Sequence, residues 1–118
     1  MTGSEMITNA LGKLGYNDSL NNVGLSNRLM NRQLDILNQV YIELLVATKA
    51  DEIKPLESVN DELQLTAEVL YDCMSYGVAA FIAQSEGDAD NQQIYMTLYM
   101  QKKNRLNRIE TVEDVIPV

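Results

Sequence analysis

The chain has 118 residues, of which 46% are hydrophobic and 22% charged, and its nine basic and seventeen acidic side chains give a formal net charge of −8. This length suits one compact domain, and the apolar content is sufficient for a packed core, which excludes a globally disordered chain. The sequence contains no histidine, which excludes histidine-dependent catalysis, and its acidity argues against the broad basic surface of a nucleic-acid-binding protein.

The chain has one cysteine, Cys73, which excludes an internal disulfide. No apolar run approaches the roughly 20 residues of a membrane span, and the first residues lack the pattern of a secretory signal. We therefore expect synthesis in the cytoplasm.

The first predicted helix begins after Thr2, which forms a capping-box spacing with Glu5. Apolar residues then recur at helical intervals, at Met6, Ile7, Ala10, Leu11 and Leu14. Gly15 suits the left-handed position after a helix end. The following stretch "YNDSLNNVG" has the composition of a loop.

A long second helix is predicted from about Leu25 to about Thr48. Its apolar stripe consists of Met30, Leu34, Leu37, Tyr41 and Leu44, in steps of four and three. No proline or glycine interrupts the run, so the sequence predicts a single helix.

The segment "KADEIKPLESVNDELQL" breaks the helical pattern. Pro55 disfavours helix at the residue before it, and "SVND" has turn composition. Ile53 and Leu56 before the turn, and Leu63 and Leu65 after it, predict a short β-hairpin between the second and third helices.

Thr66 is the predicted N-cap of the third helix, with Glu68 in the first turn. The stretch "GVAAFIA" is rich in small residues, which predicts close packing of another helix.

The fourth helix is predicted from about Ala89 to about Arg108, with inward-facing residues Tyr95, Leu98, Tyr99, Leu106 and Ile109. The final "ETVEDVIPV" lacks a helical period and is predicted to be extended. The predicted fold is therefore an all-α, four-helix bundle-like domain over residues 1–108, with an extended tail over 109–118.

The stretch "SEGDADNQQ" has two interpretations, a calcium loop or a junction between helices. Counted from Asp88, the calcium pattern places Asp90 correctly, but Gln93 stands where the turn glycine is required. The junction accounts for every residue: Gly87 ends one helix and Asp88 caps the next. The sequence therefore favours the junction.

The acidic residues near the end of the chain have two interpretations, a magnesium site or a solvated tail. Glu110, Glu113 and Asp114 faintly resemble the acidic set of an all-α magnesium hydrolase, but the second helix offers only Asp35 and Glu43, two turns apart. A solvated acidic tail explains this run better.

Cys73 has no histidine to activate it and lies on an apolar helix face, which predicts a buried structural thiol. Tyr71 and Tyr76 are the tyrosines expected to be partly exposed, where they could serve an interface. We therefore expect no catalytic site, no metal and no cofactor.

A basic cluster closes the fourth helix and consists of Lys102, Lys103, Arg105 and Arg108. These side chains complement the helix dipole if they are exposed. Alternatively, they meet an acidic surface of a neighbouring copy, where an acidic protein that self-assembles needs its cations.

The order of these segments resembles the head-to-tail adaptor (head-completion, or connector) proteins of tailed bacteriophages. A short helix ending in "LGKLGYND" precedes the long helix "NRLMNRQLDILNQVYIELL" and a proline-containing break with "DELQL". The small-residue helix "VLYDCMSYGVAAFIAQSEGD" and then "NQQIYMTLYMQKKNRL" follow. The resemblance spans about residues 5 to 108, and its evidence is the order and spacing of motifs that are individually degenerate.

The resemblance implies a non-enzymatic virion protein of the neck that forms a ring, usually of twelve copies, beneath the portal. Such a ring extends the channel through which DNA passes without specific binding, and it presents a docking surface to the tail or stopper protein. The family commonly grips the portal with its C-terminal extension. The residues in that position here are Val112, Val115, Ile116 and Val118.

In a ring, one surface of a subunit meets a different surface of the next. We expect the basic cluster to meet the acidic 51–62 loop of a neighbour, whose carboxylates are Asp51, Glu52, Glu57, Asp61 and Glu62. The alternative function is a small acidic, phage-encoded regulatory or inhibitor protein that binds a host partner.

Overall fold

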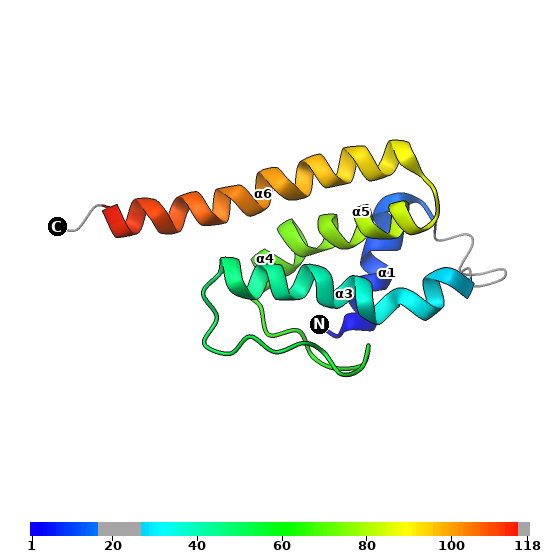
Figure 1. The fold of residues 1–118 in the computed structure, drawn as a ribbon, viewed down its shortest axis with the longest axis horizontal. Helices are drawn as coiled ribbons and strands as arrows, with labels where there is room; N and C mark the ends of the chain where they lie inside the picture. Colours follow the sequence, from blue (N-terminus) through cyan, green and yellow to red (C-terminus); the bar gives the residue numbers. More distant parts are fainter. Residues whose placement is uncertain (17–26, 116–118) are drawn as a thin grey trace.

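The computed structural model describes residues 1–16 and 27–115, with side chains described through residue 106. The fold is all-α, as predicted, with four helical segments in the described residues (Figure 1). They are α1 (Gly3–Leu14), α3 (Asn27–Ala47), a composite of α4 (Ala67–Val69), η1 (Leu70–Met74) and α5 (Ser75–Ser85), and α6 (Ala89–Val115). The predicted loop after residue 16 lies outside the described residues.

The helix α5 lies at the centre of the molecule and packs against α1, α3 and α6. Figure 1 shows α3 and α6 on opposite sides of it, with α1 crossing behind. Its buried residues are Ser75, Gly77, Val78, Ala79, Ala80, Ile82, Ala83 and Ser85. A helix that is apolar on nearly all sides must be enclosed by others, which explains the central position.

Gly77 sets the spacing between α5 and its neighbours. A Cβ atom at this position would lie 2.8 Å from the Tyr99 ring and 3.0 Å from Cγ1 of Val40. The absence of a side chain therefore lets α6 and α3 approach α5 closely, as the small-residue stretch predicted.

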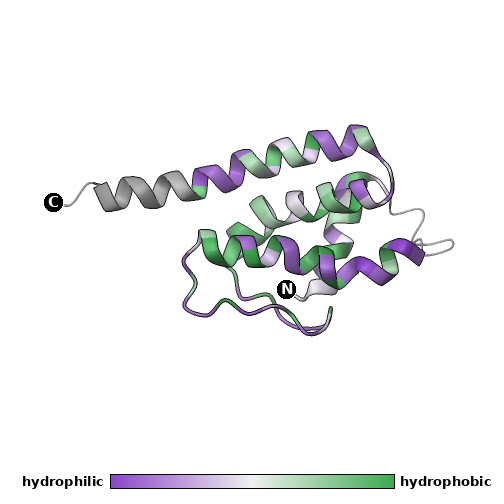
Figure 2. Cartoon of the chain, in the orientation of Figure 1, coloured by the Kyte–Doolittle hydropathy of each residue, from purple (hydrophilic) through white to green (hydrophobic). Residues whose placement is uncertain are grey.

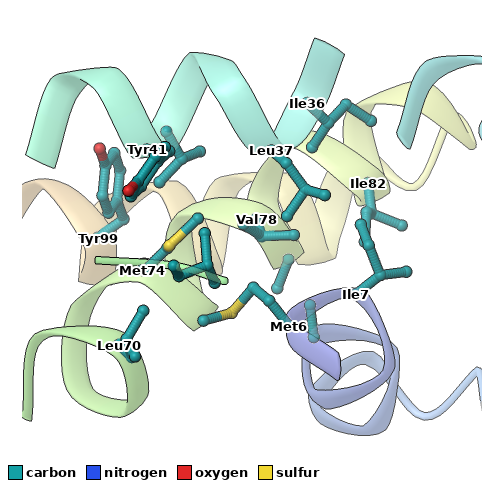
Figure 3. Packing of buried hydrophobic residues seen from close by; sticks show 14 of the residues in the cluster. Met6, Ile7, Ile36, Leu37, Tyr41, Leu70, Met74, Val78, Ile82 and Tyr99 are labelled. Atoms are coloured by element: carbon teal, nitrogen blue, oxygen red, sulfur yellow. The ribbon is translucent and has the colours of Figure 1, made fainter. Parts of the chain in front are cut away.

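The hydrophobic core is formed by all four helical segments. Figure 3 shows Met6 and Ile7 of α1 pointing toward Val78 and Ile82 of α5. Figure 2 shows that the apolar residues of α3 alternate with hydrophilic residues along the helix. The predicted stripe of α3 is buried at Leu37, Tyr41 and Leu44, whereas Met30 at its start is 59% exposed.

The predicted helix ends are confirmed at α1. The hydroxyl of Thr2 accepts a hydrogen bond from the N–H of Glu5, and the Glu5 carboxylate accepts one from the N–H of Thr2. Gly15 ends the helix with a φ of 77°. These contacts lie within a few residues of each other, so the sequence specifies them locally.

The third helix contains a π-helical turn, η1, that the sequence did not predict. Thr66 caps its start, as predicted, by accepting a hydrogen bond from the N–H of Val69. After the π turn, the hydroxyl of Ser75 donates to the carbonyl of Tyr71. The prediction assumed a regular α-helical period through this segment, so it did not anticipate a turn that contains one additional residue.

The predicted β-hairpin is not formed, since the described residues contain no β-strand. The 51–65 segment instead bonds to the start of α1. The N–H groups of Gly3 and Ser4 donate to the carbonyls of Asp61 and Val59, and one isolated antiparallel bridge joins Thr2 to Glu62. These long-range partners replace the hairpin ladder that sequence alternation predicted.

The final helix extends beyond the predicted boundary at residue 108. Helix α6 continues to Val115, so most of the tail predicted as extended is helical, and Figure 1 shows this end projecting past the other helices. The sequence from Asp88 to Pro117 contains no glycine and no other proline, so no helix-breaking residue interrupts α6. Residues Ile116 and Val118 lie outside the described residues.

Among the described helices, none combines the length and the apolar character needed to cross a membrane.

Candidate interaction surfaces

The acidic 51–62 loop forms the wall of a pocket of about 620 Å³ beside the C-terminal half of α3. Tyr41 and Leu45 of α3 contribute an aromatic and an aliphatic wall, and Lys54 is the one basic residue in the lining. All five predicted carboxylates line it, namely Asp51, Glu52, Glu57, Asp61 and Glu62. The sequence showed only that these five acidic residues share one loop. The tertiary structure shows that all five line the same pocket.

Asn38 of α3 holds Leu56, one of the residues that line this pocket. Its Nδ2 donates to the carbonyl of Leu56 at 3.0 Å, and its Oδ1 accepts from the N–H of Leu56 at 2.7 Å. The Leu56 side chain is buried in the core. One amide side chain therefore satisfies both backbone groups of a residue that has no strand partner.

Two of the five carboxylates are engaged within the chain. Asp61 Oδ2 accepts hydrogen bonds from the N–H groups of Glu57 and Ser58, at 2.9 and 3.0 Å, and closes the turn. Glu62 Oε2 lies 3.0 Å from the α-amino nitrogen of Met1. These contacts hold the loop in shape rather than leaving both groups for a partner.

The other three carboxylates, those of Asp51, Glu52 and Glu57, are exposed. None of the ion pairs found among the described residues involves them. The described residues also contain no group of acidic or cysteine side chains that could hold a metal ion. The apolar walls of Tyr41 and Leu45 beside exposed carboxylates suit an extended cation with an apolar stem, such as an arginine or lysine side chain.

Lys102, the first residue of the basic cluster, binds within the chain. Its Nζ lies 2.8 Å from Asp72 Oδ1 and 4.7 Å from the centroid of the Tyr76 ring. Lys13 of α1 also lies over this ring, at 4.4 Å. The Tyr76 side chain, predicted for an interface, therefore stabilises two lysines through its π-system.

Lys103 is likewise occupied. Its Nζ lies 3.7 Å from Glu43 Oε1, which also accepts a hydrogen bond from the Tyr99 hydroxyl at 2.5 Å. Burial, together with the neighbouring Glu43, raises the pKa of Tyr99, so the hydroxyl keeps its proton and donates.

The structure separates the basic cluster into two parts. Lys102 and Lys103 have side chains only 20% and 18% exposed. Arg105 is exposed, and the Arg108 side chain lies outside the described ones. The described cation of this cluster that remains available to a neighbour is therefore Arg105.

The junction between α5 and α6 is confirmed. Gly87 has a φ of 72°, and the Asp88 carboxylate accepts a hydrogen bond from the N–H of Asn91 at 3.3 Å. The Tyr16 hydroxyl donates to Asp88 at 2.5 Å and is the main cause of the lowered pKa of this carboxyl group. The Asp88 carboxylate, considered as a calcium ligand, therefore caps α6 and binds Tyr16, which follows the end of α1.

Cys73 is 3% exposed, as predicted for a structural thiol. Burial raises its pKa to about 11, so the reactive thiolate is disfavoured near neutral pH. Tyr71 is 54% exposed, which agrees with its predicted position on the surface.

The acidic residues considered for a magnesium site do not form a cluster among the described side chains. Asp35 is exposed on α3, whereas Glu43 contacts Tyr99 and Lys103. The side chains of the acidic run at 110–114 lie outside the described ones. The side chains of the tail residues expected to bind the portal also lie outside the described ones. Of these residues, Val112 and Val115 belong to α6.

Comparison of the chain with protein-family models, curated proteins and solved structures finds no match in any of the three.

Proposed function

We propose that the chain is a head-to-tail connector adaptor of a tailed bacteriophage. In this proposal it joins a ring beneath the portal, extends the DNA channel and offers a docking surface to the tail or stopper protein. It acts by binding rather than by catalysis. The proposed family rests on the resemblance in the order and spacing of the helical motifs. The proposed way of assembly rests on the acidic pocket and on the exposed Arg105 of α6.

The observation that carries the proposal is the presence of two different, complementary surfaces on one chain. An acidic pocket lies beside the C-terminal half of α3, and the helix α6 carries the exposed Arg105 and projects past the other helices (Figure 1). Heterologous contacts, in which one surface binds a different surface of the next copy, form a ring when the rotation between neighbouring copies closes.

The ring contact places Arg105, with Arg108 beyond it, against the acidic pocket of the neighbouring subunit. Lys102 and Lys103 take no direct part, because Asp72 and Glu43 already bind them. A guanidinium group suits this role, since it can bind carboxylates with two parallel hydrogen bonds.

The portal is bound by the end of α6 and the residues after it. Because α6 continues to Val115, this element docks as a helix in a groove rather than as an added strand. The residues concerned remain Val112, Val115, Ile116 and Val118.

The net charge of −8 suits a channel that DNA crosses. An electronegative lumen repels the phosphate backbone and prevents DNA from adhering to the wall. The protein would reside in the neck of the virion after synthesis in the host cytoplasm.

Native mass spectrometry of the chain, alone and mixed with the portal protein from the same genome, tests the proposal. We expect a complex with about one copy per portal subunit, as closed rings require, and its loss when residues 110–118 are deleted. A monomer or dimer that ignores the portal would overturn the proposal.

A charge reversal tests the ring contact separately from portal binding. Glu57→Lys places a cation in the acidic pocket and should prevent neighbouring subunits from binding each other. Asp35→Lys makes the same change in charge at an exposed position of α3 that does not line this pocket, and it should leave the ring intact. Equal ring formation by both variants would remove the pocket from the contact.

A second candidate function is a regulatory protein that binds a basic host partner. The gathering of five carboxylates around one pocket favours it, because such a site fits a basic side chain of any protein. Copy number separates the candidates: an adaptor joins a high-order ring, whereas a regulator binds its partner as a monomer or dimer.

A further inference from the structure

The outward side of α6 is exposed and carries no ionisable group over more than three turns. The exposed residues of this face are Gln93, Ile94, Thr97, Met100, Gln101 and Asn104. Two of them are large apolar side chains, with Ile94 54% and Met100 41% exposed. Charged residues are depleted and methionine enriched at the centres of protein interfaces, so this face has an interface composition.

The two ends of this face carry opposite charges. Asp90 lies exposed in the first turn of α6, and Arg105 lies exposed at the other end. Neither takes part in an ion pair found among the described residues. The helical rise places them about 22 Å apart along the axis.

We propose that this face of α6 binds the same face of a second copy of the chain, with the two helices antiparallel and related by a twofold axis near Thr97. In this arrangement Arg105 of each copy meets Asp90 of the other, which gives two equivalent ion pairs. Ile94 of each copy packs near Met100 and Gln101 of the other, on the uncharged part of the face.

Charge selects both the partner and the orientation. Two copies of a chain with a net charge of −8 repel each other over most of their surfaces, and this face is free of charge at its centre. A parallel pairing would place Asp90 beside Asp90, whereas the antiparallel pairing joins opposite charges and also opposes the two helix dipoles. In a twofold contact, residue i binds residue j on both sides, as this pattern requires.

The contact is narrow, because one helix of each copy contributes to it. Interfaces well below the standard size of about 1,600 Å² belong to weak or transient complexes. We therefore expect a dimer that forms at high protein concentration and dissociates on dilution.

This inference does not depend on the proposed function. Asp90 belongs to the dimer contact alone, and Glu57 to the ring contact alone. Failure of one proposal therefore leaves the other standing. Arg105 takes part in both contacts, so a chain in the dimer cannot use it to bind a ring neighbour. The dimer would have to dissociate when the chain binds the portal and joins the ring.

Sedimentation equilibrium over a range of concentrations tests the dimer through charge reversal. Arg105→Asp and Asp90→Arg, each alone, should weaken dimerisation at least tenfold, since each brings like charges together. The double variant restores two opposite pairs and should recover most of the affinity. A monomeric wild-type chain at all concentrations, or a double variant as weak as the single ones, would overturn the proposal.

Crosslinking tests the orientation. With a short bis-maleimide reagent, Thr97→Cys should give a covalent dimer, because the twofold axis brings the two positions together. Asn104→Cys should not, since antiparallel packing separates its two copies by about 21 Å along the helices. Native Cys73 is buried and provides a low background. Equal crosslinking at both positions would indicate parallel helices and contradict the proposal.

Discussion

The contact between α5 and α6 and the 51–65 segment are held in place by different interactions. The first is apolar packing around Gly77, where a Tyr99 ring occupies the space that a side chain would fill. The second is irregular and is held by hydrogen bonds from Asn38 and from the start of α1, with buried Leu56 and Leu63 as its apolar anchors.

The difference shows how an acidic pocket can exist on a small helical domain. Packing determines the distance between helices but cannot satisfy the backbone of an irregular segment. The Asn38 side chain of α3 and backbone N–H groups at the start of α1 do so instead. They hold the segment while the carboxylates of Asp51, Glu52 and Glu57 stay exposed. The helical packing should therefore respond most to volume, and the pocket to the loss of single hydrogen bonds.

The largest expected effect is that of adding volume at Gly77. We expect Gly77→Val to lower the free energy of unfolding by about 3 kcal/mol, because overpacking a filled core forces its neighbours to shift. Urea denaturation measures this. Tyr99→Leu in the same chain should relieve part of the clash, so strictly additive losses in the double variant would contradict the account.

Removing the anchor of the pocket should have the next largest effect. Asn38→Ala leaves the N–H and carbonyl of Leu56 without partners, and we expect a loss of about 2 kcal/mol, as for unsatisfied buried groups. Hydrogen exchange should rise in the 51–65 segment before it rises in α5. Asn31→Ala, at an exposed position of the same helix, is the control and should leave exchange unchanged.

Removing the hydroxyl of Tyr99 tests the polar edge of the helical packing. Tyr99→Phe keeps the ring against Gly77 but loses the hydrogen bond to Glu43, and we expect a cost of about 1 kcal/mol. Thermal unfolding measures the shift. A loss as large as that of Gly77→Val would mean that the hydrogen bond, rather than packing, dominates this contact.

The smallest expected effect is that of Lys102→Met. The ion pair with Asp72 lies at the surface, and such pairs contribute less than about 1 kcal/mol. Unfolding measured at low and high salt should show that the difference from wild type shrinks as the charges are screened. A salt-independent loss would indicate that the Lys102 stem contributes through packing instead.

Features of the molecule that depend on neighbouring residues were predictable from the sequence. The capping box at Thr2, the glycine that ends α1 and the Asp88 cap of α6 all follow from residues at fixed short spacings. The small residues around Gly77 likewise indicated close packing. Of the candidate surfaces, the acidic loop was predictable as a charged segment, but its closure into a pocket was not.

What the sequence by itself determined is therefore the all-α class, the caps at both ends of α1 and at the start of α6, and the close packing of another helix on the small-residue stretch. Local hydrogen bonds and the spacing of apolar residues encode these features. Only the tertiary structure decided that the 51–65 segment bonds to α1 instead of to itself, and that Lys102 and Lys103 bind within the chain. The partners in these contacts lie 30 to 61 residues apart in several cases, and no local pattern marks them. Each of these groups could bind several distant partners. The packing of the whole fold determines which of them lies within reach.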